Sequence, residues 1–437
     1  MNYTKTVLCD VRLPDGRVTD VTIVNGCISH IGSSNRADSD EILFCHHQLL
    51  VPASIDMHVH MRDGVQSAKE TWESGTQSAL AGGVSLVVDQ PNTIPSLVTR
   101  DAFLNRFEIA RNGSYTHFVI NGAITSETTA TDIFDLLDAG VLAFGEVFYG
   151  PSSYGEPVSK EDLTSAFYEL SHVLPYFSSP ILVTVHAETV TDGCDISLQT
   201  HDELRSIAGE CAAIMDVTML MREFLSPSLR AHICHVSSVQ GLEMIASLPH
   251  MSSEVMPHHL FLSRDMLPDE AWYKMNPPLR TEQERRRLWE QWSSIDVIAS
   301  DHAPHTVLEK EGAFELAPSG VPGVETMIPL LMAEVKAGHI SLSDLIQKTV
   351  FRPAELLGIP APRICVGSRA DLCLYPDTIT CIDPENLHSK AEWSPFEGKN
   401  AIFPSLVFLS GQVAYDARSD RFVKREVEWF SRSPAWE

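Results

Sequence analysis

Hydrophobic and polar positions follow different patterns along the chain, and each pattern predicts a different kind of element. In the first fifty residues, short apolar runs at Thr6–Val11, Val18–Val24 and Cys27–Ile31 are separated by Pro14-Asp15-Gly16 and Asn25-Gly26. An Asn-Gly pair between two apolar runs is a strong signal for a β-hairpin. This segment is therefore expected to form short strands joined by tight turns.

A similar pattern returns near the C-terminus. Apolar runs lie at Ala370–Tyr375, Leu406–Leu409 and Gln412–Tyr415, with Ser410-Gly411 as a turn between the last two. Two β-rich blocks at opposite ends of one chain can share a hydrophobic core. We predict that they pair into one small β-sandwich.

Between these blocks, short apolar runs alternate with amphipathic stretches, which is the pattern of βα units and a parallel sheet. The predicted strands are 52–58, Val84–Asp89, His117–Gly122, Val141–Phe148, Ile181–Val185, Ala231–His235, Ser253–Pro257 and Asp296–Ser300. Helices are expected at Lys69–Ala81, Thr99–Arg111, Lys160–Leu174 and Glu203–Phe224. Eight such repeats predict an α/β fold, a closed (β/α)8 barrel whose chemistry lies at the C-terminal ends of the strands.

This reading divides the chain into three parts. Residues 1–50 and 356–437 form the two halves of the sandwich, and residues 51–355 form the catalytic barrel.

Composition narrows the class of protein. The chain is 44% hydrophobic and 21% charged, which is ordinary for a globular protein. It has no run of about 18 apolar residues, so no membrane span is expected, and its N-terminus lacks the apolar core of a secretion signal. Its nine cysteines are scattered and odd in number, which favours a reducing cytoplasm over a disulfide framework.

The charge balance argues against polyanionic partners. The chain has 32 basic and 58 acidic residues, a formal net charge of −26 at pH 7. Such a surface repels phosphate backbones, so neither nucleic acid nor an anionic membrane is an expected partner.

Metal-ligand residue types fall at the predicted strand ends. His58 and His60 are two residues apart, so in an extended segment they point the same way. His186, His235 and Asp301 end or follow three further strands. One histidine among 18 is more often a surface or core residue, but this convergence indicates a site for Zn²⁺ or a similar divalent ion.

The motifs around these residues resemble those of class I dihydroorotases, in the cyclic-amidohydrolase branch of the amidohydrolase superfamily. In order, they are DMHVHMR (56–62), QPNT (90–93), PHH (257–259), KMNPPLR (274–280), SDHAPHT (300–306) and HSKAEWSPFEG (388–398). The resemblance implies a metal-bearing TIM-type barrel with a small β-sandwich built from both termini. KMNPPLR and DHAPH are the most specific of these motifs.

The resemblance also implies roles for the metal-binding residues. His58 and His60 would bind one ion, His186 and His235 the other, and Asp301 would contact the first ion and carry protons. A hydroxide between two ions would attack the amide carbonyl. The expected cofactor is Zn²⁺, two per chain, although the same ligands accept Co²⁺ or Mn²⁺.

The fourth predicted strand departs from related hydantoinases and allantoinases, which have a carbamylated lysine that bridges both metals there. No lysine lies between Val141 and Ser159, and Glu146 is the nearest carboxylate. We predict that Glu146 is the bridge. The alternative is that Glu146 faces solvent or another partner and that the site is mononuclear or asymmetric.

Substrate-binding residues follow from the same motifs. A substrate carboxylate needs a donor-rich partner, and a guanidinium offers a bidentate one. By resemblance, Arg62, Asn92 and His305 hold this carboxylate and Asn276 binds the ring amide, while Ser319 and Gly320 lie in a loop whose backbone contacts the ring. Glu188, His258 and His259 are assigned supporting roles. Lys69-Glu70 is expected to be a solvated first turn of a helix.

The expected function is that of a dihydroorotase: reversible cyclisation of N-carbamoyl-L-aspartate to L-dihydroorotate and water, in de novo pyrimidine (UMP) synthesis. Two alternatives stay open. One is another cyclic amidohydrolase, hydantoinase-like or allantoinase-like. The other is an inactive scaffold subunit, although the five expected ligands are intact. A homo-oligomer and an association with aspartate carbamoyltransferase are further hypotheses about partners.

Overall fold

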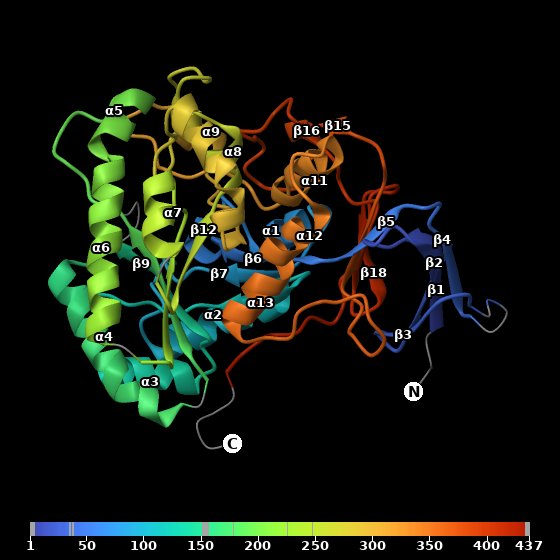
Figure 1. The fold of residues 1–437 in the computed structure, drawn as a ribbon. Helices are drawn as coiled ribbons and strands as arrows, with labels where there is room; N and C mark the ends of the chain where they lie inside the picture. Colours follow the sequence, from blue (N-terminus) through green and yellow to red (C-terminus); the bar gives the residue numbers. More distant parts are fainter. Residues whose placement is uncertain are drawn as a thin grey trace.

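The structure is a computed structural model that describes residues 5–34, 36, 39–150, 157–177, 179–224, 226–246 and 248–432. Two lobes are visible in Figure 1. The larger lobe contains the middle of the chain, with strands surrounded by helices. The smaller lobe contains strands from both ends of the chain, so blue and red segments lie together there.

Eight parallel strands form the centre of the larger lobe. They are β6 (Ser54–Val59), β7 (Val84–Asp89), β8 (His117–Ile120), β9 (Ala143–Tyr149), β10 (Ile181–Ala187), β11 (Leu229–Ile233), β12 (Met251–Val255) and β13 (Val297–Ile298). The order β6-β7-β8 forms one sheet and β13-β12-β11-β10-β9 another. Parallel bridges Gly122↔Phe144 and Val59↔His302 join them at both edges. The predicted barrel and its eight strands are therefore present.

Helices cover this barrel. They are α1 (Trp72–Ala81), α2 (Arg100–Gly113), α3 (Ala130–Asp138), α4 (Lys160–Val173), α5 (Leu198–Leu204), α6 (Ile207–Glu223), α7 (Val239–Ala246), α8 (Pro257–Phe261), α9 (Glu282–Glu290), α10 (Val307–Lys310), α11 (Met327–Ala337), α12 (Leu342–Ile346) and α13 (Arg352–Leu357). Short 3-10 turns lie at Gly64–Gln66, Leu174–Tyr176, Ala271–Tyr273, Trp292–Ser294 and Pro384–Asn386, and a π-helical turn at Gln347–Phe351.

Two helix predictions need correction. The stretch predicted as one helix over 203–224 contains the end of α5 and all of α6, because Arg205 leaves the helical conformation and the Ser206 side chain caps the amide of Gly209. Helix α1 begins at Trp72, with Thr71 as its N-cap. Lys69 and Glu70 therefore precede the helix and are not its solvated first turn.

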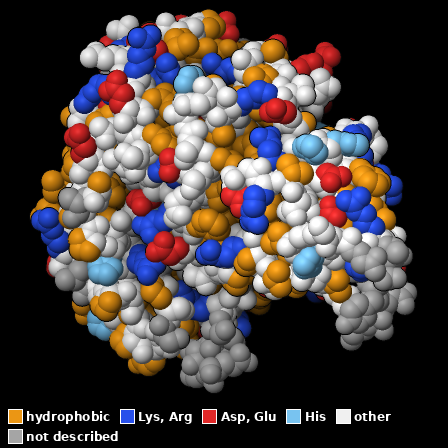
Figure 2. All heavy atoms as spheres, turned by 45° about the vertical axis from the view of Figure 1, so that its right-hand side comes forward, with side chains coloured by type: hydrophobic (Ala, Val, Ile, Leu, Met, Phe, Trp, Pro, Cys, Tyr) orange, Lys and Arg blue, Asp and Glu red, His pale blue; other side chains and the backbone are white. Residues whose placement is uncertain are grey.

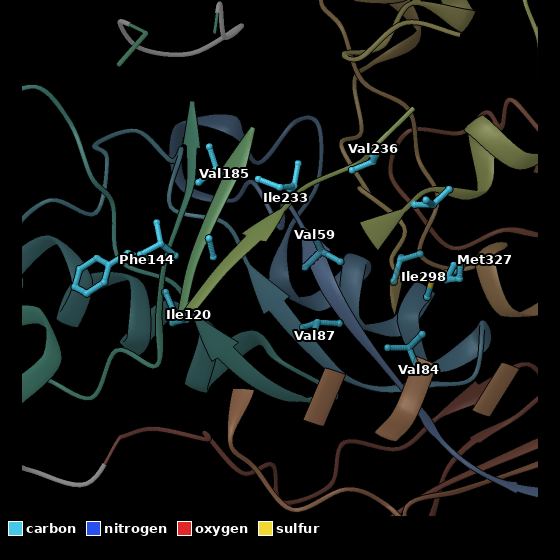
Figure 3. Close-up of a cluster of buried hydrophobic side chains, with 14 of the residues drawn as sticks. Val59, Val84, Val87, Ile120, Phe144, Val185, Ile233, Val236, Ile298 and Met327 are labelled. Atoms are coloured by element: carbon cyan, nitrogen blue, oxygen red, sulfur yellow. The ribbon is translucent and has the colours of Figure 1, made fainter. Parts of the chain in front are cut away.

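Alternation of side chains along the strands separates the outer core from the interior of the barrel. On β10, Val183 and Val185 belong to the core under the helices, whereas Leu182 belongs to a second cluster inside the barrel. His186 has the parity of Leu182, so it points inward at the C-terminal end of its strand. Figure 3 shows the outer core, with Val59, Val87, Ile120, Phe144, Val185, Ile233 and Ile298 from seven of the eight strands.

The smaller lobe joins the two ends of the chain by hydrogen bonds. Its strands are β1 (Lys5–Arg12), β2 (Val18–Val24), β3 (Cys27–Ile31), β4 (Glu41–Phe44), β5 (Leu49–Pro52), β14 (Leu372–Tyr375), β17 (Leu406–Leu409), β18 (Gln412–Asp416) and β19 (Arg421–Phe422). The order is β19-β18-β17-β14-β5-β1-β2-β3, with β4 also paired to β1. The antiparallel pair β14–β5 connects the two halves. A separate pair, β15 (Thr380–Cys381) and β16 (Asn400–Ala401), lies in the C-terminal part.

A common hydrophobic core supports this sheet. Leu8, Val21 and Ile23 from the N-terminal half pack with Leu372 and Phe408 from the C-terminal half. The three residue ranges assigned to domains stay a prediction. Strand β5 crosses the boundary at residue 50 and leads directly into β6, and residues 1–4 and 433–437 lie outside the described part.

The surface drawn in Figure 2 has acidic and basic side chains interspersed, with small apolar areas between them. Within the described residues, no helix combines the length and apolarity that crossing a bilayer requires.

Arg432 anchors the end of the described chain under the barrel. Its guanidinium is buried and donates to the main-chain carbonyls of Ser179 (2.9 Å) and Pro180 (2.8 Å), just before β10. It also contacts the carbonyls of Val141 and Leu142, just before β9. One side chain therefore holds the N-terminal ends of two adjacent strands.

We expect Arg432→Met to lower the free energy of unfolding by about 2–4 kcal/mol, because it leaves several buried carbonyls without a donor. Denaturant unfolding measures this value. The control is Arg418→Met, an exposed arginine paired with Asp416, which should change stability by less than about 0.5 kcal/mol. Equal stability of the two variants would contradict the anchoring role.

Candidate metal centre

Six predicted ligands meet at the C-terminal ends of five strands of the barrel. They are His58 on β6, His60 just after it, Glu146 on β9, His186 on β10, His235 after β11 and Asp301 after β13. Each is at most 7% exposed. Their ligand atoms form two groups, His58–His60–Asp301 and Glu146–His186–His235, in which all atoms lie within 4.8 Å of one another.

Glu146 links these two groups, because its two carboxylate oxygens face different histidines. Oε1 lies 2.6 Å from His235 Nε2 and 3.1 Å from His186 Nδ1. Oε2 lies 3.3 Å from His58 Nε2 and 3.9 Å from His60 Nε2. The position of Glu146 thus suits one oxygen for each of two cations, and the side chain is buried rather than facing solvent.

The donor set fits divalent metal ions. Imidazole nitrogens and carboxylate oxygens are the usual ligands of Zn²⁺ and similar ions. His58 Nε2 is buried, makes no hydrogen bond, and lies 3.6 Å from Asp301 Oδ1. A buried polar nitrogen without a hydrogen-bond partner is costly unless another ligand satisfies it. The ligand atoms of a third group, His58, Cys234 and Glu254, also lie within 4.8 Å of one another.

Partners on the far side of three rings orient them toward the centre. His58 Nδ1 lies 2.6 Å from Glu254 Oε1, and His60 Nδ1 lies 2.8 Å from Asn92 Oδ1. His186 Nε2 lies 3.1 Å from Glu188 Oε2. Each acceptor receives a hydrogen bond from the protonated nitrogen of its ring. The other ring nitrogen then has a lone pair that can bind a metal ion.

Electrostatics in this cluster favour cations. Burial would raise the pKa of Glu146, but His58, His186 and His235 outweigh it and hold that pKa well below its usual value. Burial would lower the pKa of His186, yet Glu146 and Glu188 raise it to about 9. The carboxylates are therefore ionised, and the cluster needs positive charge that protons or metal ions can supply.

Backbone ties fix the strand ends that carry these ligands. Asp56 Oδ1 accepts from the amides of His58 (3.2 Å) and Ser300 (3.0 Å), and the His60 amide donates to the carbonyl of His302 at 2.8 Å. These bonds join β6 to the segment after β13. The first and last strands of the barrel are thereby held together at the candidate metal ligands.

Arg62 lies on a segment whose backbone is held by Arg106 and Asp89. Its carbonyl accepts from Arg106 Nη1 at 2.5 Å, and Arg106 in turn pairs with Asp89 at 2.7 Å. Asp89 Oδ1 also accepts from the Met61 amide. Arg62 itself is buried, with φ at +50°. The backbone that presents its guanidinium is therefore fixed by a buried ion pair.

Asn92 and His305 contact different groups. Asn92 contacts His60 through its Oδ1. His305 Nε2 lies 3.0 Å from the Ser319 carbonyl, and Nδ1 lies 3.2 Å from Lys69 Nζ. Burial, together with the charge of Arg62, lowers the pKa of His305 to about 3 although Glu309 opposes the shift. His305 is thus a neutral ring.

Asn276, Ser319 and Gly320 come together across two loops. Ser319 Oγ donates to Asn276 Oδ1 at 3.1 Å, and the Gly320 amide donates to the Lys274 carbonyl at 3.0 Å. Gly320 has φ at +129°, and a Cβ there would lie 2.7 Å from the Ala303 carbonyl oxygen and 3.1 Å from His305 Nε2. Only glycine fits this close approach.

Several supporting residues were missed at the level of sequence. Glu254 gave one signal, a charged residue inside the buried strand β12. The Asp89–Arg106 pair gave none, because its members lie on separate elements. Glu70 was misread: it is buried, contacts His302 Nε2 at 3.3 Å and accepts from Ser389 Oγ at 2.6 Å. Lys69 pairs with Glu309 at 2.6 Å.

Comparison with known proteins agrees with the motifs. A family described as dihydro-orotase-like matches residues 47–159. A dihydroorotase of Methanosarcina acetivorans is 36% identical over 91% of this chain and 89% of its own length. A dihydroorotase of Halobacterium salinarum is 36% identical over 94% of this chain and 96% of its own length.

Several solved structures with the same fold are hydantoinases. An L-hydantoinase (dihydropyrimidinase) from Arthrobacter aurescens has a TM-score of 0.86 at 24% identity and covers 98% of this chain and 100% of its own. A D-hydantoinase from Thermus sp. has a TM-score of 0.84 at 21% identity, over 99% and 100% of the two chains. These likenesses confirm the predicted fold class, the barrel with an attached β-domain.

Glu146→Gln should remove most of the second metal ion, because an amide supplies one neutral oxygen where the two groups share a charged carboxylate. Elemental analysis after metal loading and dialysis measures the ions per chain. The matched control is Asp371→Asn, a buried carboxylate that contacts His117 Nε2 at 3.3 Å near the starts of the strands. Full occupancy of both sites in Glu146→Gln would contradict the bridge.

Proposed function

The chain belongs to the dihydroorotase family of metal-dependent cyclic amidohydrolases, and from this premise we propose that it interconverts N-carbamoyl-L-aspartate and L-dihydroorotate with loss or gain of water. The observation that supports the proposal is the joint placement of two groups of candidate metal ligands and Arg62 at one end of the barrel. Within a cell, this reaction belongs to pyrimidine synthesis in the cytoplasm.

The candidate metal ligands account for the reactivity of the amide. Divalent ions held there, which we propose to be two Zn²⁺, would polarise the amide carbonyl and lower the pKa of water toward neutrality. We propose His58, His60 and Asp301 as ligands of one ion, His186 and His235 as ligands of the other, and Glu146 as the carboxylate shared by both.

Asp301 moves the proton. Its Oδ1 lies 3.1 Å from His60 Nε2 and 3.6 Å from His58 Nε2. Burial would raise the pKa of Asp301, but His60 and His58 lower it. The carboxylate is therefore ionised and can accept a proton from the attacking water. It then delivers this proton to the ring nitrogen that leaves.

The remaining residues bind and orient the substrate. Arg62 holds the substrate carboxylate through its guanidinium, with Asn92 and the neutral ring of His305 beside it. Asn276 binds the ring amide, and the backbone at Ser319 and Gly320 lies along the ring. When the carboxylate and the ring amide of the substrate are both held, the reacting carbonyl is aligned with the candidate metal ligands.

The substrate class is tested by comparing dihydroorotate with hydantoin, which lacks the carboxylate. We expect the metal-loaded protein to hydrolyse dihydroorotate far faster than hydantoin. Arg62→Met should raise KM for dihydroorotate by about 10–100-fold, the effect of losing a charge-assisted hydrogen bond. Steady-state kinetics measures both results.

The outcomes separate the alternatives. Turnover of hydantoin alone would make the protein a different cyclic amidohydrolase. No turnover of either compound, with no bound metal, would indicate a scaffold subunit. A homo-oligomer and an association with aspartate carbamoyltransferase stay hypotheses that sizing of the purified protein with and without that enzyme would test.

Asp301→Asn should keep its metal ions and lose about 10²–10⁴-fold in kcat, because an amide cannot accept the proton from water. Metal analysis and kcat are measured on the same sample. Asp63→Asn, which changes a carboxylate that caps Gly64 near the site, is the control and should change kcat by no more than a few-fold. A near-normal kcat in Asp301→Asn would remove the proton-carrying role.

A further inference from the structure

Lys310 is a buried lysine that the proposed reaction does not use directly. It is the last residue of α10 and is 1% exposed. Its ammonium donates to three main-chain carbonyls: Lys274 at 3.1 Å, Pro318 at 3.0 Å and Gly320 at 3.1 Å. An ammonium has three donors, so the three carbonyls use all of them.

These carbonyls belong to the two loops that carry the proposed ring-binding residues. Lys274 precedes Asn276 by two residues, and Pro318 and Gly320 flank Ser319. The carbonyl between them, that of Ser319, faces His305 Nε2. Three consecutive carbonyls are therefore directed at two side chains, which fixes the peptide planes of this loop.

Three carbonyl oxygens that converge on one point repel one another unless a cation lies between them. The Trp393 ring lies on the same ammonium, with Nζ 5.6 Å from the ring centroid, and contributes a cation–π contact. The position thus supplies oxygen and π-electron density around a single charge.

We propose that Lys310 is a positioning residue for the substrate: its ammonium joins the loop at Lys274–Asn276 to the loop at Pro318–Gly320 and so shapes the surface that receives the pyrimidine ring. This inference rests on the proposed function, because it deepens the account of that site. Lys310 contacts neither the metal ligands nor the reacting atoms in this arrangement. Its effect is on binding of the ring.

The charge state of Lys310 affects the number of donors. Burial, together with the nearby Lys274, lowers the pKa of Lys310 to about 7, and Glu309 opposes this shift. The titratable groups that face it are Lys274, Glu309 and His305. Below this pKa the side chain has three donors, and above it an amine has two. The loop is expected to be held less firmly at alkaline pH.

The test compares Lys310→Met with a matched control, Lys348→Met. Lys348 is also buried, donates to the carbonyl of Ile295 and lies over a tryptophan ring, 5.4 Å from the centroid of Trp292. It differs in place, because Ile295 precedes β13 at the opposite end of the barrel.

In Lys310→Met, we expect KM for dihydroorotate to rise at least about tenfold, because the loops that receive the ring are no longer held in their binding positions before the substrate arrives. The metal content should be unchanged and kcat should stay within about threefold, because binding lost equally from substrate and transition state appears in KM. Lys348→Met should lower the melting temperature with KM unchanged. A folded, metal-loaded Lys310→Met protein with normal KM would overturn the proposal.

A second measurement needs neither a variant nor a substrate. Hydrogen exchange of the unmodified protein is followed at pH 6 and pH 9, corrected for the intrinsic rate at each pH. The amides of Ser319, Gly320 and Val321 should lose protection at pH 9 relative to amides of β10. Equal protection at both pH values would overturn the proposal. If the unmodified protein does not hydrolyse dihydroorotate, the proposed function fails, and this measurement still tests whether the Lys310 ammonium holds the loop at Pro318–Gly320.

Discussion

Burial of negative charge at the mouth of the barrel is the constraint on which the structure depends. Glu146, Asp301, Glu188 and Glu254 are each at most 7% exposed and lie beside imidazole rings. An ionised carboxylate without a partner is very costly in such surroundings. The strands can end where they do because each carboxylate faces a histidine, and the whole cluster can be neutralised by divalent ions.

A second layer of polar contacts holds the segments that carry these buried carboxylates and histidines. Asp56 ties β6 to the segment after β13, and the Asp89–Arg106 pair holds the backbone before the Arg62 guanidinium. Glu70 joins His302, next to Asp301, to Ser389 near the other end of the chain. The C-terminal segment is thereby part of the active end of the barrel, as well as part of the smaller lobe. The same contacts that join remote segments of the chain therefore also position the candidate metal ligands and Arg62.

The sequence allowed the barrel and the ligand positions to be predicted, for a physical reason. Period-two apolar runs and turn residues are local signals, so β7, β2 and β3 have the bounds that were expected. His58 and His60 were found because a two-residue spacing puts both rings on one side of a strand.

By contrast, Glu70 and Arg106 lie on segments whose local pattern is that of an ordinary helix. Their partners are remote in sequence, and nothing local indicates them. The break between α5 and α6 was missed because apolar periodicity continues across it while one serine cap restarts the helix.

Glu146, on the fourth strand, reaches the cluster because hydrogen bonds hold its backbone close to the neighbouring strands. A carbamylated lysine reaches the cluster on a long side chain, whereas a glutamate must start closer. The Glu146 amide donates to Gln90 Oε1 at 2.7 Å, and Gln90 Nε2 donates to the Met57 carbonyl at 3.0 Å. The side chain of Gln90, which follows β7, thus links the backbone of β9 at Glu146 to the backbone of β6 at Met57. Gln90 and Glu146 are therefore adjacent in space, and the Gln90 side chain fixes the backbone from which the Glu146 carboxylate reaches the cluster.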